Sequence, residues 1–232
     1  MVPAALKGTL VIQKATCTPC QTKHTYEKDA LKVDLLVPRV LLGLHGKKRE
    51  NKKPLELPLV ALGDHVNGGD DFNVRLTVAE YPPVLHMPFF APAGLLVGEV
   101  RGGNLEQISF AFVDLAGLLK SNARPRTDVT TRIAFINGAL SRTLAKIAYC
   151  FGVAELGLDG FDGREMRDFL YGKRDDAYNF VGGGSDQTVS SPGKYLHELQ
   201  LRERGQFLTV LVRLFASCGA PTYEVVVGRV KA

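Results

Sequence analysis

The sequence predicts an α+β fold, in which a small β-turn-α appendage precedes a larger domain of antiparallel sheet with a long helix. Three observations predict this class. The C-terminal third contains consecutive β-rich segments joined by short turns, which favours antiparallel pairing. Residues 129–156 carry an apolar stripe at helical spacing. A basic segment after residue 46 separates the first helical pattern from everything that follows.

The appendage begins with residues 9–13, which are β-rich, follow Gly8 and predict a short strand. Residues 16–20 predict a tight turn. From Thr22 the pattern is helical, and Pro38 is expected to end this helix or to lie just beyond it. The apolar residues that predict the helix recur every three or four positions: Tyr26, Ala30, Val33 and Val37.

The larger domain begins with four predicted strands, at residues 55–61, 72–79, 95–100 and 107–113. The last two flank Arg101-Gly102-Gly103-Asn104, which is a hairpin turn signal. Residues 81–92 contain too many prolines for a central strand.

The second half of this domain contains the predicted helices and a sheet. We expect helices at 129–156, ending at Gly157, and at 163–171, ending at Gly172. Four predicted strands follow, at 178–181, 194–203, 206–216 and 222–230. The predicted division of the chain is an appendage (1–46), a basic linker (47–54) and an α+β domain (55–232).

Length and composition limit the class of protein. The 232 residues suit one large domain with a small appendage, and a hydrophobic fraction of 45% is ordinary for a globular protein. No apolar run approaches the roughly 20 residues that span a bilayer, so no membrane partner is expected. Residues 1–7 lack the features of a signal peptide, which predicts a cytoplasmic location. Nothing in the sequence indicates an oligomeric state.

The most informative short motif is Cys17-Thr18-Pro19-Cys20. Two thiolates at this spacing, between a predicted strand and a predicted helix, can both reach one zinc ion. A structural zinc site needs four ligands, and His24 is a candidate for a third. A redox pair and two cysteines without metal are the alternatives. Cys150 and Cys218 lie in apolar segments and are expected to be buried free thiols.

The appendage resembles the second half of an HNH-type nuclease module, which occurs in bacterial and phage proteins. Residues 2–12 (VPAALKGTLVI) and 15–20 (ATCTPC), with Glu27 and Leu31, carry this resemblance. Met1-Val2-Pro3 matches the hydrophobic pair and Pro that follow the family's catalytic His. Segments similar to the family's accessory region lie at 145–149, 167–172 and 221–228.

The resemblance implies a ββα-metal fold with a zinc knuckle whose second cysteine pair is Cys17 and Cys20. It also implies a general-base His that activates water against a phosphodiester, helped by a divalent metal. The chain contains neither that His nor the first cysteine pair. Gln21 stands where the family usually has Asn, and Lys7 interrupts the Gly pair.

These departures define what we expect of the chain as it stands. We expect no catalytic residue and no cleavage, zinc only at a half-site, and the divalent metal only in a complete module. We expect Met1 to be an internal methionine of a longer nuclease, and a decayed copy with only binding or structural roles is the alternative. The corresponding functional alternative is a non-catalytic nucleic-acid-binding or protein-interaction module.

Charge indicates the partner. Residues 1–53 contain 11 Lys and Arg against 4 Asp and Glu, a balance of +7, whereas residues 54–232 contain 18 against 20, a balance of −2. Such a segment suits contact with a polyanion, DNA rather than RNA, although a solvated linker is the alternative. The candidate phosphate-binding residues are Lys47, Lys48, Arg49, Lys52 and Lys53.

Other motifs are interpreted as structural. Gly182-Gly183-Gly184-Ser185-Asp186 lacks the Gly-Lys-Ser/Thr of a P-loop and is interpreted as a flexible turn. His65, His86 and His197 are scattered and are interpreted as isolated polar or half-buried residues. Six phenylalanines are interpreted as core residues: Phe89, Phe90, Phe110, Phe112, Phe151 and Phe169.

Overall fold

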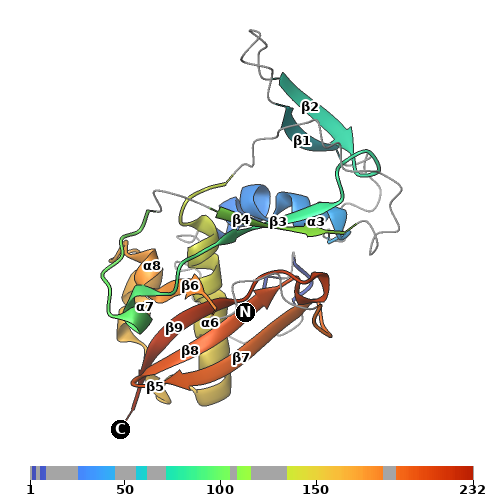
Figure 1. Ribbon diagram of the computed structural model, residues 1–232. Coiled ribbons are helices and arrows are strands. Elements are labelled where there is room, and N and C mark those ends of the chain that lie inside the picture. Colours follow the sequence, from blue (N-terminus) through green and yellow to red (C-terminus); the bar gives the residue numbers. More distant parts are fainter. Residues whose placement is uncertain are drawn as a thin grey trace.

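Figure 1 shows the chain as a computed structural model, in which a long helix packs against an antiparallel sheet. The described part is α+β, which confirms the predicted fold class. The structure describes residues 2–3, 6–8, 26–44, 56–61, 72–104, 109–115, 135–184 and 192–231.

The sheet has five strands in the order β5-β9-β8-β7, and β6 also pairs with β9. All of its pairs are antiparallel. The predicted meander is confirmed, since Gly205 makes the turn between β7 and β8 with φ +60°, and Gly219 lies between β8 and β9 with φ +80°. The strands are β5 (Phe161–Asp162), β6 (Val181–Gly183), β7 (His197–Arg204), β8 (Phe207–Leu214) and β9 (Tyr223–Val230).

The long helix α6 spans Ala139–Leu156 and packs against β8 and β9. Its apolar stripe is buried in the core, with Leu140, Leu144 and Ile147 at most 1% exposed. The helix ends at Gly157, as predicted, but it begins later than residue 129. Residues 135–138 are not helical. Gly138, directly before the helix, has a φ of +83°, whereas every residue of a right-handed α-helix has a negative φ, so the helix cannot extend back through Gly138.

Two short helices follow α6. Helix α7 (Arg164–Leu170) confirms the helix predicted at 163–171, and Gly172 follows it at φ +74°. The prediction of a strand at 178–181 is wrong for its first three residues, because Ala177–Phe180 forms helix α8. A tertiary contact explains the difference: the side chain of Asn179 accepts a hydrogen bond from the backbone N–H of Arg101 at 2.7 Å, which a propensity argument does not include.

Two separate two-stranded ribbons precede the sheet in sequence. One pairs β1 (Glu56–Ala61) with β2 (Phe72–Thr77), at the positions of two predicted strands. The other pairs β3 (Val84–Phe89) with β4 (Ser109–Asp114).

The second ribbon contradicts the predicted hairpin of 95–100 with 107–113. Residues Gly94–Val97 form the short helix α4, and β4 pairs instead with the proline-rich segment. Proline is compatible with β3 because both strands of a ribbon are edge strands. The carbonyl of Pro88 accepts a hydrogen bond from the Tyr223 hydroxyl at 2.8 Å, so this residue points its backbone polar group at another element.

The helical pattern from Thr22 is described from Tyr26 onward and contains three elements. These are α2 (Tyr26–Asp29), the π-helical turn η2 (Ala30–Asp34) and α3 (Leu36–Leu41). The prediction that Pro38 ends the helix is wrong, since Pro38 lies within α3. It is the third residue of that helix. The first four N–H groups of an α-helix have no intrahelical acceptor, so proline loses no helical hydrogen bond at this position.

This helical segment packs on α6. Glu27 and Lys146 form an ion pair, and the backbone N–H of Ile136 donates to Asp34 Oδ1 at 2.7 Å. Leu35, Val40 and Leu41 belong to the same hydrophobic cluster as the buried face of α6. The division at residues 46 and 54 stays a prediction. Among the described helices, none has the length and apolar character to cross a membrane.

Candidate functional site

The residues that the sequence predicts as site residues lie outside the described part of the chain. These are Cys17, Cys20, Lys47, Lys48, Arg49, Lys52 and Lys53. The zinc half-site and the phosphate contacts therefore stay predictions. Within the described ranges, no group of three or more His, Cys, Asp or Glu side chains is arranged to hold a metal ion. Cys150 is half-buried and Cys218 is buried, and both are free thiols.

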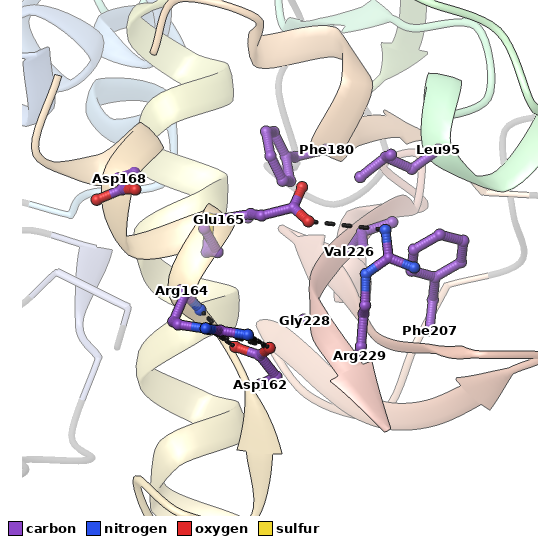
Figure 2. A pocket seen from close by; sticks show the side chains of 11 residues that line it. Leu95, Asp162, Arg164, Glu165, Asp168, Phe180, Phe207, Val226, Gly228 and Arg229 are labelled. Atoms are coloured by element: carbon purple, nitrogen blue, oxygen red, sulfur yellow. Dashed lines mark hydrogen bonds and ion pairs between the residues drawn. The ribbon is translucent and has the colours of Figure 1, made fainter. Parts of the chain in front are cut away.

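A hollow of about 350 Å³ lies between α7, the start of β8 and the end of β9 (Figure 2). Its lining also includes residues of α4, β5 and α8. The apolar lining residues are Leu95, Met166, Phe180, Phe207 and Val226. A hollow of this size and lining can accept part of a small molecule or one side group of a larger partner.

The lower part of the hollow in Figure 2 holds the ion pair of Asp162 and Arg164. The Arg164 guanidinium donates to both oxygens of Asp162, at 2.9 and 2.6 Å. These hydrogen bonds lower the pKa of Asp162 to about 2. The hydrogen bond from Lys173 likewise lowers the pKa of Asp168. Both carboxyl groups are therefore ionised throughout the neutral range.

Above the Arg164 ion pair in Figure 2, also on α7, Glu165 points toward Arg229 of β9, and its carboxylate lies between two arginines. It is 3.3 Å from Arg174 Nη1 and 3.6 Å from Arg229 Nη2. Each guanidinium also lies over an aromatic ring, Arg174 over Phe180 at 5.1 Å and Arg229 over Phe207 at 5.0 Å. Arg174 also donates to both oxygens of Asp176, at 3.0 and 2.5 Å, and Arg229 donates to Gln206 at 2.8 Å. Ring stacking and hydrogen bonds together hold both arginines beside Glu165.

Ion pairing dominates the chemistry of the hollow. Its ionisable lining residues, as far as the structure describes them, are Asp, Glu and Arg, and they form ion pairs. General acid–base catalysis works best with a pKa near the operating pH, whereas ion pairing keeps Asp162 and Asp168 ionised. The described lining contains no Ser, Cys, Lys or His that could act as a nucleophile or a base.

The two described histidines have structural surroundings, in agreement with the sequence interpretation. His197 Nδ1 accepts from the Phe215 N–H at 3.2 Å, so Nε2 carries the proton that bonds the Leu6 carbonyl at 2.7 Å. Burial lowers the pKa of His197, which keeps this tautomer neutral. His86 is half-buried on β3 with its ring edge-on to Phe110. His65 lies outside the described residues.

The glycine run at 182–184 is not a turn. Gly182 and Gly183 belong to β6, pair with β9 and are buried, so the interpretation as a flexible turn is wrong for them. The reason is a close approach of backbones: the N–H of Gly183 bonds the carbonyls of Phe90 and Ala91, both at 3.1 Å.

Comparisons with known proteins give no relative: no family model matches the chain, and neither a curated protein nor a solved structure is significantly similar to it. The class that the fold and the hollow define is an α+β protein with a surface hollow lined by ion pairs.

Proposed function

We propose that this chain binds nucleic acid, DNA rather than RNA, through the basic run Lys47–Lys53, and that it does not itself cleave its partner. One observation carries the proposal. The residues that the structure describes contain 18 Lys and Arg against 17 Asp and Glu, a balance of +1, whereas residues 47–53 contain five against one, a balance of +4. Most of the net charge of +5 is therefore concentrated in seven consecutive residues.

Ion pairing in the body supports this assignment. Cations that already have an acidic partner contribute little to attraction of a polyanion, because the partner cancels their charge at a distance. Five pairs illustrate how widely the described cations are matched: Arg75–Glu56, Arg142–Asp175, Lys146–Glu27, Lys173–Asp168 and Arg204–Glu224.

The resemblance to HNH-type nucleases supports the same kind of partner. In this proposal the chain is a degenerate member of that family, and it functions in the cytoplasm.

The test compares two variants of the full chain with equal changes in charge. One replaces Lys47, Lys48, Arg49, Lys52 and Lys53 with Gln. The control replaces five exposed cations of the body with Gln: Arg75, Lys173, Lys194, Arg202 and Lys231. Fluorescence anisotropy with duplex DNA, single-stranded DNA and RNA gives Kd at several salt concentrations.

We expect the first variant to lose most of its affinity and the slope of log Kd against log salt to fall by about 3 to 4.5, because each phosphate contact contributes about 0.9 for duplex DNA. The control should change the slope by less than about 1. Equal losses in both variants would assign the binding to general charge. Absence of salt-sensitive binding by the unmodified chain would leave a protein-interaction module as the function.

Zinc at Cys17 and Cys20 is a second part of the proposal. These two thiolates supply half of a tetrahedral site, so the resemblance predicts weak zinc binding that both cysteines are needed to support. Metal analysis after dialysis against low-micromolar zinc should find zinc in the unmodified chain and not in the Cys17→Ser/Cys20→Ser variant. The control is Cys150→Ser, and equal zinc in all three proteins would refute the half-site.

A further inference from the structure

Among the strands that the structure describes, β7 has the longest edge without a neighbouring strand. It lies at the end of the five-stranded sheet, where β8 pairs with one side of it and no described strand pairs with the other (Figure 1). All eight residues of β7 pair with β8 in one unbroken register. The strand contains neither a proline nor a bulge, which protect many exposed edges from other chains. By contrast, β1 and β3 contain Pro58 and Pro88, and β5 and β6 have only two and three residues.

The turn between β7 and β8 determines which backbone groups of β7 face outward. A two-residue loop joins the strands, so the flanking residues Arg204 and Phe207 form a hydrogen-bonded pair. Such pairs alternate along an antiparallel ladder, so the even-numbered residues of β7 direct their N–H and C=O groups to β8. Just before the strand, the carbonyl of Leu196 has the same direction, because it accepts from the Ala216 N–H at 2.7 Å. The odd-numbered residues therefore direct their backbone groups outward: His197, Leu199, Leu201 and Glu203.

The side chains of β7 are complementary to a second copy of the same strand. Antiparallel pairing of two copies through their outward groups requires odd-numbered residues to face odd-numbered residues. When Gln200 faces its own copy across a two-fold axis, Glu198 faces Arg202 twice, and Leu199 faces Leu201 twice. Charged side chains on an edge prevent pairing where like charges meet, whereas opposite charges face each other in this register.

The neighbouring registers are less favourable. Sliding one copy by two residues in one direction makes Glu198 face Arg204, whose guanidinium already donates to Glu224 at 2.7 Å. Sliding it by two more residues makes Arg202 face its own copy, where like charges repel. Sliding it by two residues in the opposite direction makes Glu198 face Gln200, so the pair of opposite charges is lost.

Both charged side chains of this register are accessible. Arg202 is exposed, and it donates to the neighbouring Gln200 of its own strand at 3.0 Å. Glu198 is half-buried, and its Oε1 accepts from the Lys194 N–H at 3.0 Å. Its Oε2 lies 3.8 Å from Arg213, which leaves capacity for a second cation, since a carboxylate has about four acceptor positions.

We propose that β7 docks a second copy of this chain, in an antiparallel pair of edges centred on Gln200 that joins two five-stranded sheets into one. Main-chain hydrogen bonds of the odd-numbered residues supply affinity, and the two pairs of Glu198 with Arg202 select the register. The interface is isologous, so it closes at two copies. This inference goes beyond the proposed nucleic-acid binding and uses no residue of the basic run.

The test uses two charge reversals of the full chain, each of which brings like charges together in both pairs. Arg202→Glu and Glu198→Arg are studied separately and as an equimolar mixture, in which a heterodimer restores opposite charges in both pairs. Arg202→Lys keeps the charge at the same position, and Glu155→Arg, at an exposed position of α6, is the control for charge reversal elsewhere. Light scattering after gel filtration and native mass spectrometry measure the mass at several concentrations, and thermal unfolding reports whether each variant keeps its fold.

We expect the unmodified chain, Arg202→Lys and Glu155→Arg to be dimeric at about 100 μM. Each reversal within β7 should raise the dimer Kd about tenfold or more, because two favourable cross-strand pairs become unfavourable, and the mixture should recover a heterodimer. Hydrogen exchange should show protection of the Leu199 and Leu201 amides that increases with protein concentration. The Gln200 amide, which bonds β8, should be protected at every concentration.

Two results would refute this inference. One is an unmodified chain that stays monomeric at about 100 μM. The other is a dimer that Arg202→Glu does not weaken, which would place the contact elsewhere on the molecule. Either result leaves nucleic-acid binding by the basic run as it was, and loss of that binding would not change the expected dimer.

Discussion

The five-stranded sheet and the β3–β4 ribbon are both antiparallel, but they differ in how much of their surface the rest of the chain covers. Strand β9 is buried from Tyr223 to Val227, because α6 packs against the sheet and strands flank β9 on both sides. The ribbon has two strands and one covered face, and Phe112 on the other face is 60% exposed. The difference teaches that burial, and with it stability, is concentrated in the sheet with α6, whereas the ribbon leaves Phe112 on an uncovered face.

The largest expected effect lies where these two regions meet, at Gly182 in β6. A Cβ atom on Gly182 would lie 2.6 Å from the carbonyl carbon of Pro92 and would collide with the backbone of Ala93, just after β3. Backbone atoms cannot move aside as a side chain can, so Gly182→Ala should destabilise the protein by about 3 kcal/mol or more.

Urea unfolding measures this free energy, with Gly102→Ala as the control. A Cβ on Gly102 meets nothing within 4 Å, so this variant should stay within about 0.5 kcal/mol of the unmodified protein. A small effect of Gly182→Ala would mean that the sheet and the segment after β3 are not firmly packed together.

The same comparison separates what the sequence predicts from what it does not. The meander β7-β8-β9 was predictable because its turns are local, and Gly205 and Gly219 adopt the left-handed conformations that glycine favours. The ribbon was not, since its pairing joins segments about 25 residues apart. Val97 and Val100 suggested a strand by composition, yet they are 47% and 96% exposed.

The hollow could not be predicted for a related reason. Its lining combines Leu95 with residues near 165, 207 and 228, and no local pattern indicates that these segments converge. Burial of Phe112 was mispredicted because composition does not reveal which face of a ribbon a helix covers. The cysteine pair and the basic run remain predictions of the sequence alone.

The second prediction concerns a buried charge within the sheet. Glu224 on β9 is 3% exposed, and its carboxylate accepts from Thr209 at 3.0 Å and from Arg204 at 2.7 Å. Arg204→Met should destabilise the protein by about 2 kcal/mol, because it leaves a buried carboxylate with one donor. The estimate is below the usual cost for a fully buried pair since the Arg204 side chain is 49% exposed.

The double variant Arg204→Met/Glu224→Gln should recover about half or more of that loss, because a neutral amide needs no counterion. Arg202→Met is the control, as Arg202 is exposed on the same strand. Denaturant unfolding of the unmodified protein, Arg204→Met, Glu224→Gln and the double variant completes the cycle. No recovery in the double variant would show that Arg204 acts through packing of its stem and not through charge.

The smallest expected effect concerns Asp34 in η2. Its hydrogen bond with Ile136 attaches the helical segment to the residues just before α6. Asp34 is 4% exposed, Oδ1 accepts the Ile136 N–H, and Oδ2 has no hydrogen-bond partner among the residues that the structure describes. Burial raises the pKa of Asp34 from its ordinary 3.8 to about 6. The folded state therefore holds this proton more tightly than the unfolded chain does, and this group makes stability fall as the pH rises from about 4 to above 6.

Asp34→Asn should remove this decline, because an amide stays neutral and can still accept from Ile136. The variant should be about 1 to 2 kcal/mol more stable than the unmodified protein at pH 8 and about equally stable at pH 4. Urea unfolding across this pH range measures the difference, with the exposed Asp159→Asn as the control. If Asp34→Asn were instead less stable at pH 8, the ionised carboxylate would be a needed partner of α6. The helical segment would then be attached to the sheet and α6 through charge, in contrast to the apolar attachment of the ribbon.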